Sequence, residues 1–131
     1  MADHSIQAEA EPDRTDPARP WHVLVALGFA GSEVGIVVDA VPVAVVGLVL
    51  FAASVAGILW DADYVDDPVA LAAGFGAAFV VVGAVLAAHG TGTAPIGPLE
   101  PLSGLASRGV ALVVAGFATI GGAGAVRSRR R

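Results

Sequence analysis

The sequence contains no cysteine and no lysine, and each absence narrows what the protein can do. Without cysteine there is no disulfide, no thiolate metal site and no cysteine nucleophile. Without lysine, all seven basic residues are arginines, and twelve acidic residues bring the net charge to −5. Aromatic residues are also few, at 6% of the chain, so a binding site built on many aromatic rings is not expected.

Apolar residues dominate the composition. The chain is 56% hydrophobic with a mean hydropathy of +0.76, whereas soluble domains contain about 45–50% even with glycine counted. Polar residues gather in residues 1–20 and 127–131, which leaves the apolar residues between them and predicts an integral membrane protein. The first twenty residues are acidic, contain three prolines and lack the apolar core of a secretory signal peptide, so they predict a disordered acidic tail.

Prolines and aspartates divide the apolar region into four expected helices. As one helix, residues 21–60 would be about 60 Å long, twice the roughly 30 Å hydrocarbon core, so the chain must fold back. The break is at residues 39–42, because proline starts helices and disrupts their interiors. The acidic loop DADYVDD, residues 61–67, and the glycine- and proline-rich loop 90–104 provide the other breaks. The sequence therefore predicts an all-α four-transmembrane-helix bundle of two helical hairpins, with helices over 21–38, 42–60, 68–89 and 105–126.

The arginines indicate an orientation in the membrane. Four spans place both termini on one side, and every arginine except Arg108 falls on that side. Under the positive-inside rule, both termini and the loop 61–67 are then cytoplasmic, in a multi-pass protein of the cell membrane with a basic tail at 127–131. Trp21 and Trp60 are expected as anchors at the cytoplasmic interface, where tryptophan favours the headgroup level.

One glutamate, Glu33, lies inside the apolar stretch GFAGSEVGIVV, residues 28–38. It is about 18 Å along the helix from Trp21, and a charge at the centre of a span costs about 2.5–3.5 kcal/mol on the insertion scale. Arg108, near the start of the fourth helix, is the expected partner in a structural ion pair. The alternatives are a proton or cation site and an exposed acid near the outer interface.

Small residues four positions apart occur in every expected helix. Such pairs let two helix backbones approach closely in a membrane. We expect them in packing seams inside the bundle, and an interface with a second copy is the alternative. The pairs are Gly31 and Gly35, Ala53 and Gly57, Ala73 and Ala77, and Ala118 and Gly122.

The sequence shows no pattern typical of catalysis, so we expect no enzyme, no cofactor, no metal and no nucleic acid. His89, beside a glycine-rich loop, is expected to be a solvated interface residue and not a haem ligand. The loop GTGTAPIGP lacks the lysine and the strand-to-helix setting of a phosphate loop. DADYVDD lacks the spacing of a calcium loop. The basic end RSRRR is expected to anchor the topology and to contact anionic membrane lipids.

The first expected hairpin contains the SEVG stretch at 32–35, a short turn before Pro42, and the stretch GLVLF at 47–51, which is followed by SVAGIL at 54–59. In these motifs it resembles a family of small haloarchaeal membrane proteins known as cox cluster proteins. The acid-rich, lysine-free composition also fits a salt-loving archaeon. The resemblance extends over residues 21–60 and is general afterwards. The family name reflects genes that lie near those for haem-copper terminal oxidases, so the resemblance implies an association with such an oxidase and no biochemical activity. The matching residues are Ser32, Glu33, Val34, Gly35, Gly47, Leu48, Leu50, Phe51, Ser54, Val55, Ala56, Gly57, Ile58 and Leu59.

A second resemblance is to small multidrug-resistance transporters, which also have four helices and an essential glutamate in the first. Their local AEV-I-G string is similar to SEV-G-I here, but the aromatic residues that line their drug site are missing. We therefore expect a non-catalytic accessory or assembly partner of a terminal oxidase. The alternatives are a proton-coupled small transporter that uses Glu33 and a membrane scaffold unrelated to respiration.

Overall fold

The computed structural model describes residues 20–100 and 102–131, and this part of the chain is helical without a strand. The helices are α1 (Trp21–Val37), α2 (Val41–Asp61), α3 (Pro68–Gly90) and α4 (Leu105–Arg129), with a short 3-10 helix η1 (Gly97–Leu99) between the last two. The expected all-α, four-helix fold is confirmed, and each helix starts within one residue of its expected start. The expected acidic tail lies outside the described residues, apart from Pro20.

Proline and aspartate set the helix boundaries. Pro42 and Pro68 lie in the first turns of α2 and α3, where no intrahelical partner exists for the missing N–H. Asp67 caps α3, because its Oδ1 accepts hydrogen bonds from the backbone N–H groups of Val69 and Ala70, each at 3.0 Å. Asp39 ends the turn after α1 with a φ of +56°, a left-handed conformation that aspartate adopts more readily than most residues.

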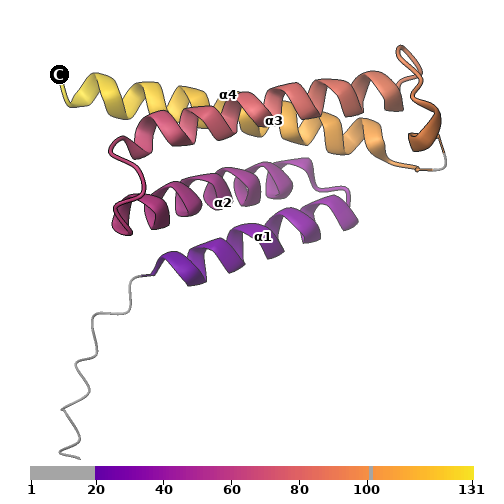
Figure 1. Ribbon diagram of the computed structural model, residues 1–131. Coiled ribbons are helices and arrows are strands. Elements are labelled where there is room, and N and C mark those ends of the chain that lie inside the picture. The colour runs from indigo at the N-terminus through magenta and orange to yellow at the C-terminus, as the bar shows by residue number, and fades with distance from the viewer. Residues whose placement is uncertain (1–19, 101) are drawn as a thin grey trace, which may run out of the picture.

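The helices form two hairpins that lie in layers (Figure 1). α1 packs on α2, α3 packs on α4, and α2 also contacts α3 and α4, so α2 separates α1 from the second hairpin. We call one end of the bundle the tail end; it carries the start of α1, the loop 61–67 and the end of α4. The loop end carries the α1–α2 turn and the loop 91–104.

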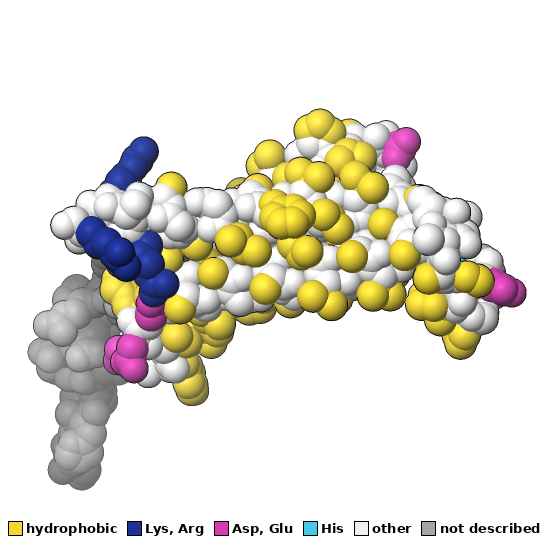
Figure 2. All heavy atoms as spheres, turned by 90° about the horizontal axis from the view of Figure 1, so that it is seen from above, with side chains coloured by type: hydrophobic (Ala, Val, Ile, Leu, Met, Phe, Trp, Pro, Cys, Tyr) yellow, Lys and Arg dark blue, Asp and Glu magenta, His cyan; other side chains and the backbone are white. Residues whose placement is uncertain are grey.

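The bundle places its large apolar side chains on the outside. Helices α2, α3 and α4 are long and apolar enough to cross a membrane, and α1, with 17 residues, is a shorter apolar helix. The buried hydrophobic side chains are five alanines and Leu105, whereas many valines, leucines and phenylalanines are exposed. Figure 2 shows arginine side chains gathered at one end of the molecule and hydrophobic side chains along the middle of the face. This inside-out distribution suits a lipid surrounding, where small residues let helices pack.

The second hairpin is joined by glycines spaced seven residues apart, which are Gly76, Gly83 and Gly90 on α3 and Gly109 and Gly116 on α4. A Cβ on Gly109 would lie 2.3 Å from the backbone nitrogen of Ala87, and one on Gly83 would lie 2.7 Å from the carbonyl oxygen of Gly109. The obstructing atoms belong to the backbone, so the two helices touch without intervening side chains. A seven-residue repeat is the period of a left-handed helix pair.

The first hairpin has a shorter seam of Gly28, Ser32 and Gly35, all buried against α2. A Cβ on Gly35 would lie 2.2 Å from the backbone nitrogen of Ala44. The hydroxyl of Ser32 donates to the carbonyl oxygen of Phe29 at 2.7 Å, so its polar group is satisfied within α1.

Candidate functional site

Glu33 lies on the surface of α1 and not between helices. Its side chain is exposed, and it has no hydrogen bond or ion pair within the described part of the chain. The preceding residue, Ser32, is buried against α2. One residue along a helix is a rotation of about 100°, which carries Glu33 out of that seam. Because α1 packs almost entirely on α2, the glutamate faces the outside of the bundle.

Arg108 does not meet Glu33, so the ion pair expected from the sequence is not formed. Arg108 is exposed near the start of α4 and lines a small cavity at the loop end together with Asp39 and Ser107. Gly35 and Ile36 of α1 line the same cavity, but Glu33 does not, because it lies on the outer face of that helix. The acidic residue that shares a hollow with Arg108 is therefore Asp39.

The small residues expected in packing seams have different surroundings. Gly35 lies in the α1–α2 seam, but a Cβ on Gly31 would meet only the Cα of Gly47, at an ordinary 3.6 Å. Gly57 is buried beneath the indole ring of Trp21, 2.8 Å from the place of its missing Cβ. Ala53 is exposed and faces a groove between the two hairpins.

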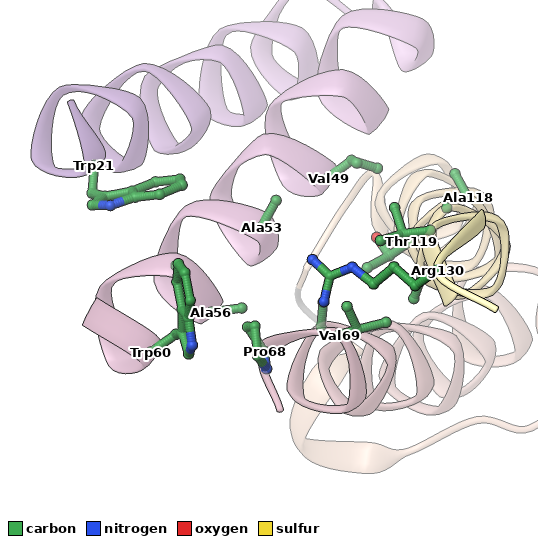
Figure 3. Close-up of a pocket in the computed structure, with 15 residues that line it drawn as sticks. Trp21, Val49, Ala53, Ala56, Trp60, Pro68, Val69, Ala118, Thr119 and Arg130 are labelled. Carbon is green, nitrogen blue, oxygen red and sulfur yellow. The ribbon is translucent and has the colours of Figure 1, made fainter. Parts of the chain in front are cut away.

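This groove, of about 410 Å³, lies between the hairpins at the tail end (Figure 3). Three helices give it small residues, and both tryptophans, Trp21 and Trp60, also line it. A wall of residues with at most one methyl group leaves a hollow that larger side chains would have filled. The small residues are Ala53, Ala56 and Gly57 of α2, Ala72 of α3, and Ala118, Gly122 and Ala123 of α4.

A second, more polar cavity of about 460 Å³ adjoins the groove, and it is lined by three arginines and two aspartates. The two hollows share the lining residues Trp60, Pro68, Val69 and Arg130. Figure 3 shows the side chain of Arg130 extending from the end of α4 into the groove. Within the described residues, the guanidinium of Arg130 makes no hydrogen bond or ion pair.

The acidic loop 61–67 closes both hairpins at the tail end. At its first residue, the Oδ2 of Asp61 accepts a 2.6 Å hydrogen bond from Nε1 of Trp21, which joins α2 to α1. At its last residue, the Oδ2 of Asp67 accepts a hydrogen bond from Nη2 of Arg127, which joins the start of α3 to the end of α4. The two outer aspartates of DADYVDD are thus contacts between helices.

The electrostatics of Asp67 keep its carboxylate charged. The hydrogen bond from the backbone N–H of Ala70 is the largest cause that holds its pKa below the ordinary value of 3.8. Partial desolvation opposes this effect, while Arg127 and the backbone N–H of Val69 lower the pKa further. Arg127 is therefore matched by a charged partner at neutral pH, and Arg130 is not.

His89, at the end of α3, contacts the loop between α3 and α4. Its Nδ1 accepts a hydrogen bond from the backbone N–H of Ile96 at 2.8 Å. Among the described residues, no group of three or more histidines, aspartates and glutamates is arranged to hold a metal ion.

Comparison with known proteins gives one result. No curated protein and no solved structure matches the chain. Residues 1–129 match a family that is described as "Family of unknown function (DUF7541)". This match extends over all four helices and nearly the whole sequence, so the chain belongs to that family.

Proposed function

We propose that the protein is a non-catalytic accessory subunit of a larger membrane complex and that it docks through α1. The observation that carries this proposal is the exposed position of Glu33, twelve residues after Trp21 in an apolar helix. Charged residues within membrane spans nearly always face protein or water, and a central charge costs about 2.5–3.5 kcal/mol on the insertion scale. A partner chain that covers α1 would supply the polar contact that Glu33 lacks within the described residues.

The position of α1 in the bundle supports the same surface. It is the shortest of the four helices and packs almost entirely on α2. Phe29 and Val37 are 58% and 80% exposed, so apolar surface is available on both sides of Glu33 along the helix. An apolar helix face with one central polar group suits association with another membrane helix, where a hydrogen bond adds to close packing.

The partner that we propose is a haem-copper terminal oxidase, because the first hairpin resembles the cox cluster proteins. The arginines at the tail end support a cytoplasmic location of both termini in the cell membrane under the positive-inside rule. A reporter fused after Arg131 should be active only with a cytoplasmic reporter, and one in the loop 91–104 only with an external reporter. The reverse pattern would contradict this orientation.

Proton-coupled transport is the second candidate, and the exposed Glu33 gives it a specific form. Because the side chain of Glu33 faces away from the other three helices, a transport path through it needs a second copy packed on α1. Such a homodimer would bring two glutamates together at its centre. A membrane scaffold unrelated to respiration is the third candidate and differs only in the partner.

The deciding experiment is affinity purification from native membranes in mild detergent, followed by mass spectrometry. Wild type should retain oxidase subunits, and Glu33→Gln should lose them, because the glutamate makes the proposed contact. Glu100→Gln is the matched control, since Glu100 is also exposed but lies outside the helices. The isolated protein should keep its thermal stability in both variants, because Glu33 has no partner within the described residues.

Each other outcome assigns a different function. A homodimer that dissociates with Glu33→Gln and moves organic cations would favour the transporter. Retention of a membrane partner other than the oxidase would favour the scaffold. Purification of the protein alone, unchanged by Glu33→Gln, would contradict docking through α1.

A further inference from the structure

The groove between the hairpins has the depth of one membrane leaflet. From Trp60 to Val49 its wall on α2 is about 16 Å long, and from Arg130 to Ala118 its wall on α4 is about 18 Å long. Half of a hydrocarbon core of about 30 Å is about 15 Å. The groove therefore extends from the tail end to about the middle of a membrane that the bundle crosses.

The inner part of the groove offers almost no polar group to a ligand. Its polar residue away from the mouth is Thr119. The hydroxyl of Thr119 donates to the carbonyl oxygen of Ala115 in the same helix at 2.8 Å, so it is already satisfied. Ala53, Ala118 and Gly122 are exposed, so the hollow is open to the surroundings of the bundle. These walls suit a hydrocarbon chain and not a polar molecule.

The mouth of the groove has the opposite character. Arg130 extends into it, and Arg131 lines the polar cavity that adjoins it. Within the described residues neither guanidinium has an acidic partner, because Asp67 is engaged by Arg127. Asp66 lines the cavity too, so the charged side chains around it are three arginines and two aspartates. Guanidinium groups bind phosphate oxygens through paired hydrogen bonds.

We propose that this groove binds one anionic membrane lipid. One hydrocarbon chain lies between α2 and α4 against the small residues, and the phosphate headgroup lies on Arg130 and Arg131. Trp60, 51% exposed at the mouth, flanks the headgroup level that tryptophan favours. The ligand must combine an apolar chain of one-leaflet length with a negative head, and an anionic lipid has both. This site is separate from α1's outer face, so it does not rest on the proposed docking function.

The test measures lipid binding by the full-length protein in native mass spectrometry. The probes are phosphatidylglycerol and phosphatidylcholine, which differ in headgroup charge. The wild type should retain one phosphatidylglycerol in preference to phosphatidylcholine. Adding salt should weaken this preference, because salt screens exposed charges.

Two neighbouring glycines provide a matched pair for the apolar part. Gly122 lines the groove, Gly121 does not, and a Cβ at either meets nothing within 4 Å. Gly122→Leu should therefore remove the lipid-bound species, while Gly121→Leu should retain it. If Gly122→Leu does not fold, Ala53→Leu fills the same groove from α2.

Two neighbouring arginines provide the pair for the headgroup. Arg130→Gln should lower the preference for phosphatidylglycerol about fivefold, since one arginine near an anionic surface contributes about 1 kcal/mol. Arg129→Gln is the control, because Arg129 lines neither hollow.

Three outcomes would overturn the proposal. One is equal binding of the two lipids by the wild type. Another is equal loss of lipid in Gly121→Leu and Gly122→Leu. The third is a lipid-free dimer that Gly122→Leu converts to monomer, which would assign the groove to a second copy of the chain.

Discussion

The two hairpins use the same small-residue packing, but only the first carries a charged residue midway along a helix. α3 and α4 have 23 and 25 residues and carry their charged residues only near the ends of α4. α1 and α2 have 17 and 21 residues, and α1 carries Glu33 on its outer face. α1 is thus short, charged and packed on one neighbour. The contrast supports the proposal that α1, and not the second hairpin, docks on a partner.

The helix contacts within the two hairpins also differ, in their length and in how far other helices cover them. Five glycines at seven-residue spacing line the contact between α3 and α4, and α2 covers part of that pair. In the first hairpin the close approach is shorter: Gly28, Ser32 and Gly35 of α1 meet Ala44 and Gly47 of α2. Nothing in the described chain covers the other side of α1. A change that pushes α1 away should therefore spare the rest of the bundle, whereas a change between α3 and α4 should not.

The largest effect is expected from Gly109→Ala in the second seam. Its Cβ would lie 2.3 Å from the backbone nitrogen of Ala87, and backbone atoms cannot move aside without shifting the helix. Overpacking of this kind costs about 1–3 kcal/mol or more. Thermal unfolding in detergent should show a lower midpoint for the whole protein.

Gly121→Ala is the control on the same helix, because its Cβ meets nothing within 4 Å. It should be neutral or stabilising, since alanine is favoured over glycine in helices by about 1 kcal/mol. Equal midpoints for Gly109→Ala and Gly121→Ala would show that α3 and α4 are not in backbone contact there.

A smaller and more local effect is expected from Gly35→Ala in the first seam. Its Cβ would lie 2.2 Å from the backbone nitrogen of Ala44, so α1 must move away from α2. The cost should fall at the lower end of about 1–3 kcal/mol, because α1 has one neighbour and can shift. Hydrogen exchange should rise in α1 and stay unchanged in α3 and α4.

Gly31→Ala tests the same seam at the other glycine of the pair Gly31 and Gly35. Its Cβ would meet the Cα of Gly47 at 3.6 Å, so alanine should fit. Faster exchange in Gly31→Ala than in Gly35→Ala would mean that α1 is rotated relative to the packing described above.

The sequence predicts the helices well, because their boundaries depend on local chemistry. Pro42, Pro68 and the cap Asp67 interrupt an apolar chain at definite positions. The loop 90–104 is equally clear, since glycines and prolines clustered within a few residues favour turns over a continuous helix. These signals need no knowledge of which helices touch.

The helix faces that meet could not be predicted in the same way. Apolar residues surround every helix, so hydropathy does not mark an inner face. With so many glycines and alanines, a spacing of four occurs widely and selects Gly31 as readily as Gly28, although only Gly28 is at a close backbone approach. The seven-residue repeat of Gly76, Gly83 and Gly90 is the signal that could have identified the second seam.

The direction in which the candidate site residues point could not be predicted from the sequence either. The sequence gives the distance of Glu33 along α1 but not the direction in which it points, and the partner Arg108 followed from depth alone. Ala118 and Gly122 fit a packing seam by spacing, yet they line the groove. That outcome depends on how far apart the two hairpins lie, which no local pattern encodes.

A still smaller effect is expected from Trp21→Phe at the tail end of the first hairpin. Phenylalanine keeps much of the ring over Gly57 but loses the hydrogen bond to Asp61. A hydrogen bond of this kind contributes about 0.5–1.5 kcal/mol. Trp60→Phe is the control, because Trp60 is exposed and has no hydrogen bond within the described residues. Equal thermal midpoints for the two variants would show that the hydrogen bond from Trp21 to Asp61 does not stabilise the first hairpin.

The smallest effect concerns the contact between Asp67 and Arg127, which joins α3 to α4 at the tail end, and this effect depends on pH. The folded-state pKa of Asp67 is lowered, first by the hydrogen bond from Ala70 and also by Arg127. Its contribution to stability is therefore fully present above the ordinary pKa of 3.8 and is lost as pH falls through the lower folded value. Because both side chains are about half exposed, solvent screening keeps this contribution small.

Asp67→Asn separates the charge from the cap, because asparagine caps helices about as well as aspartate. The variant should lose the acid-dependent loosening that the wild type shows below about pH 4. Hydrogen exchange in the first turn of α3 would measure it, with Asp66→Asn as the neighbouring control. If Asp67→Asn and wild type lose protection equally on acidification, another group is responsible. If they differ, the acidic loop holds the second hairpin by a charge, whereas it holds the first by the indole of Trp21.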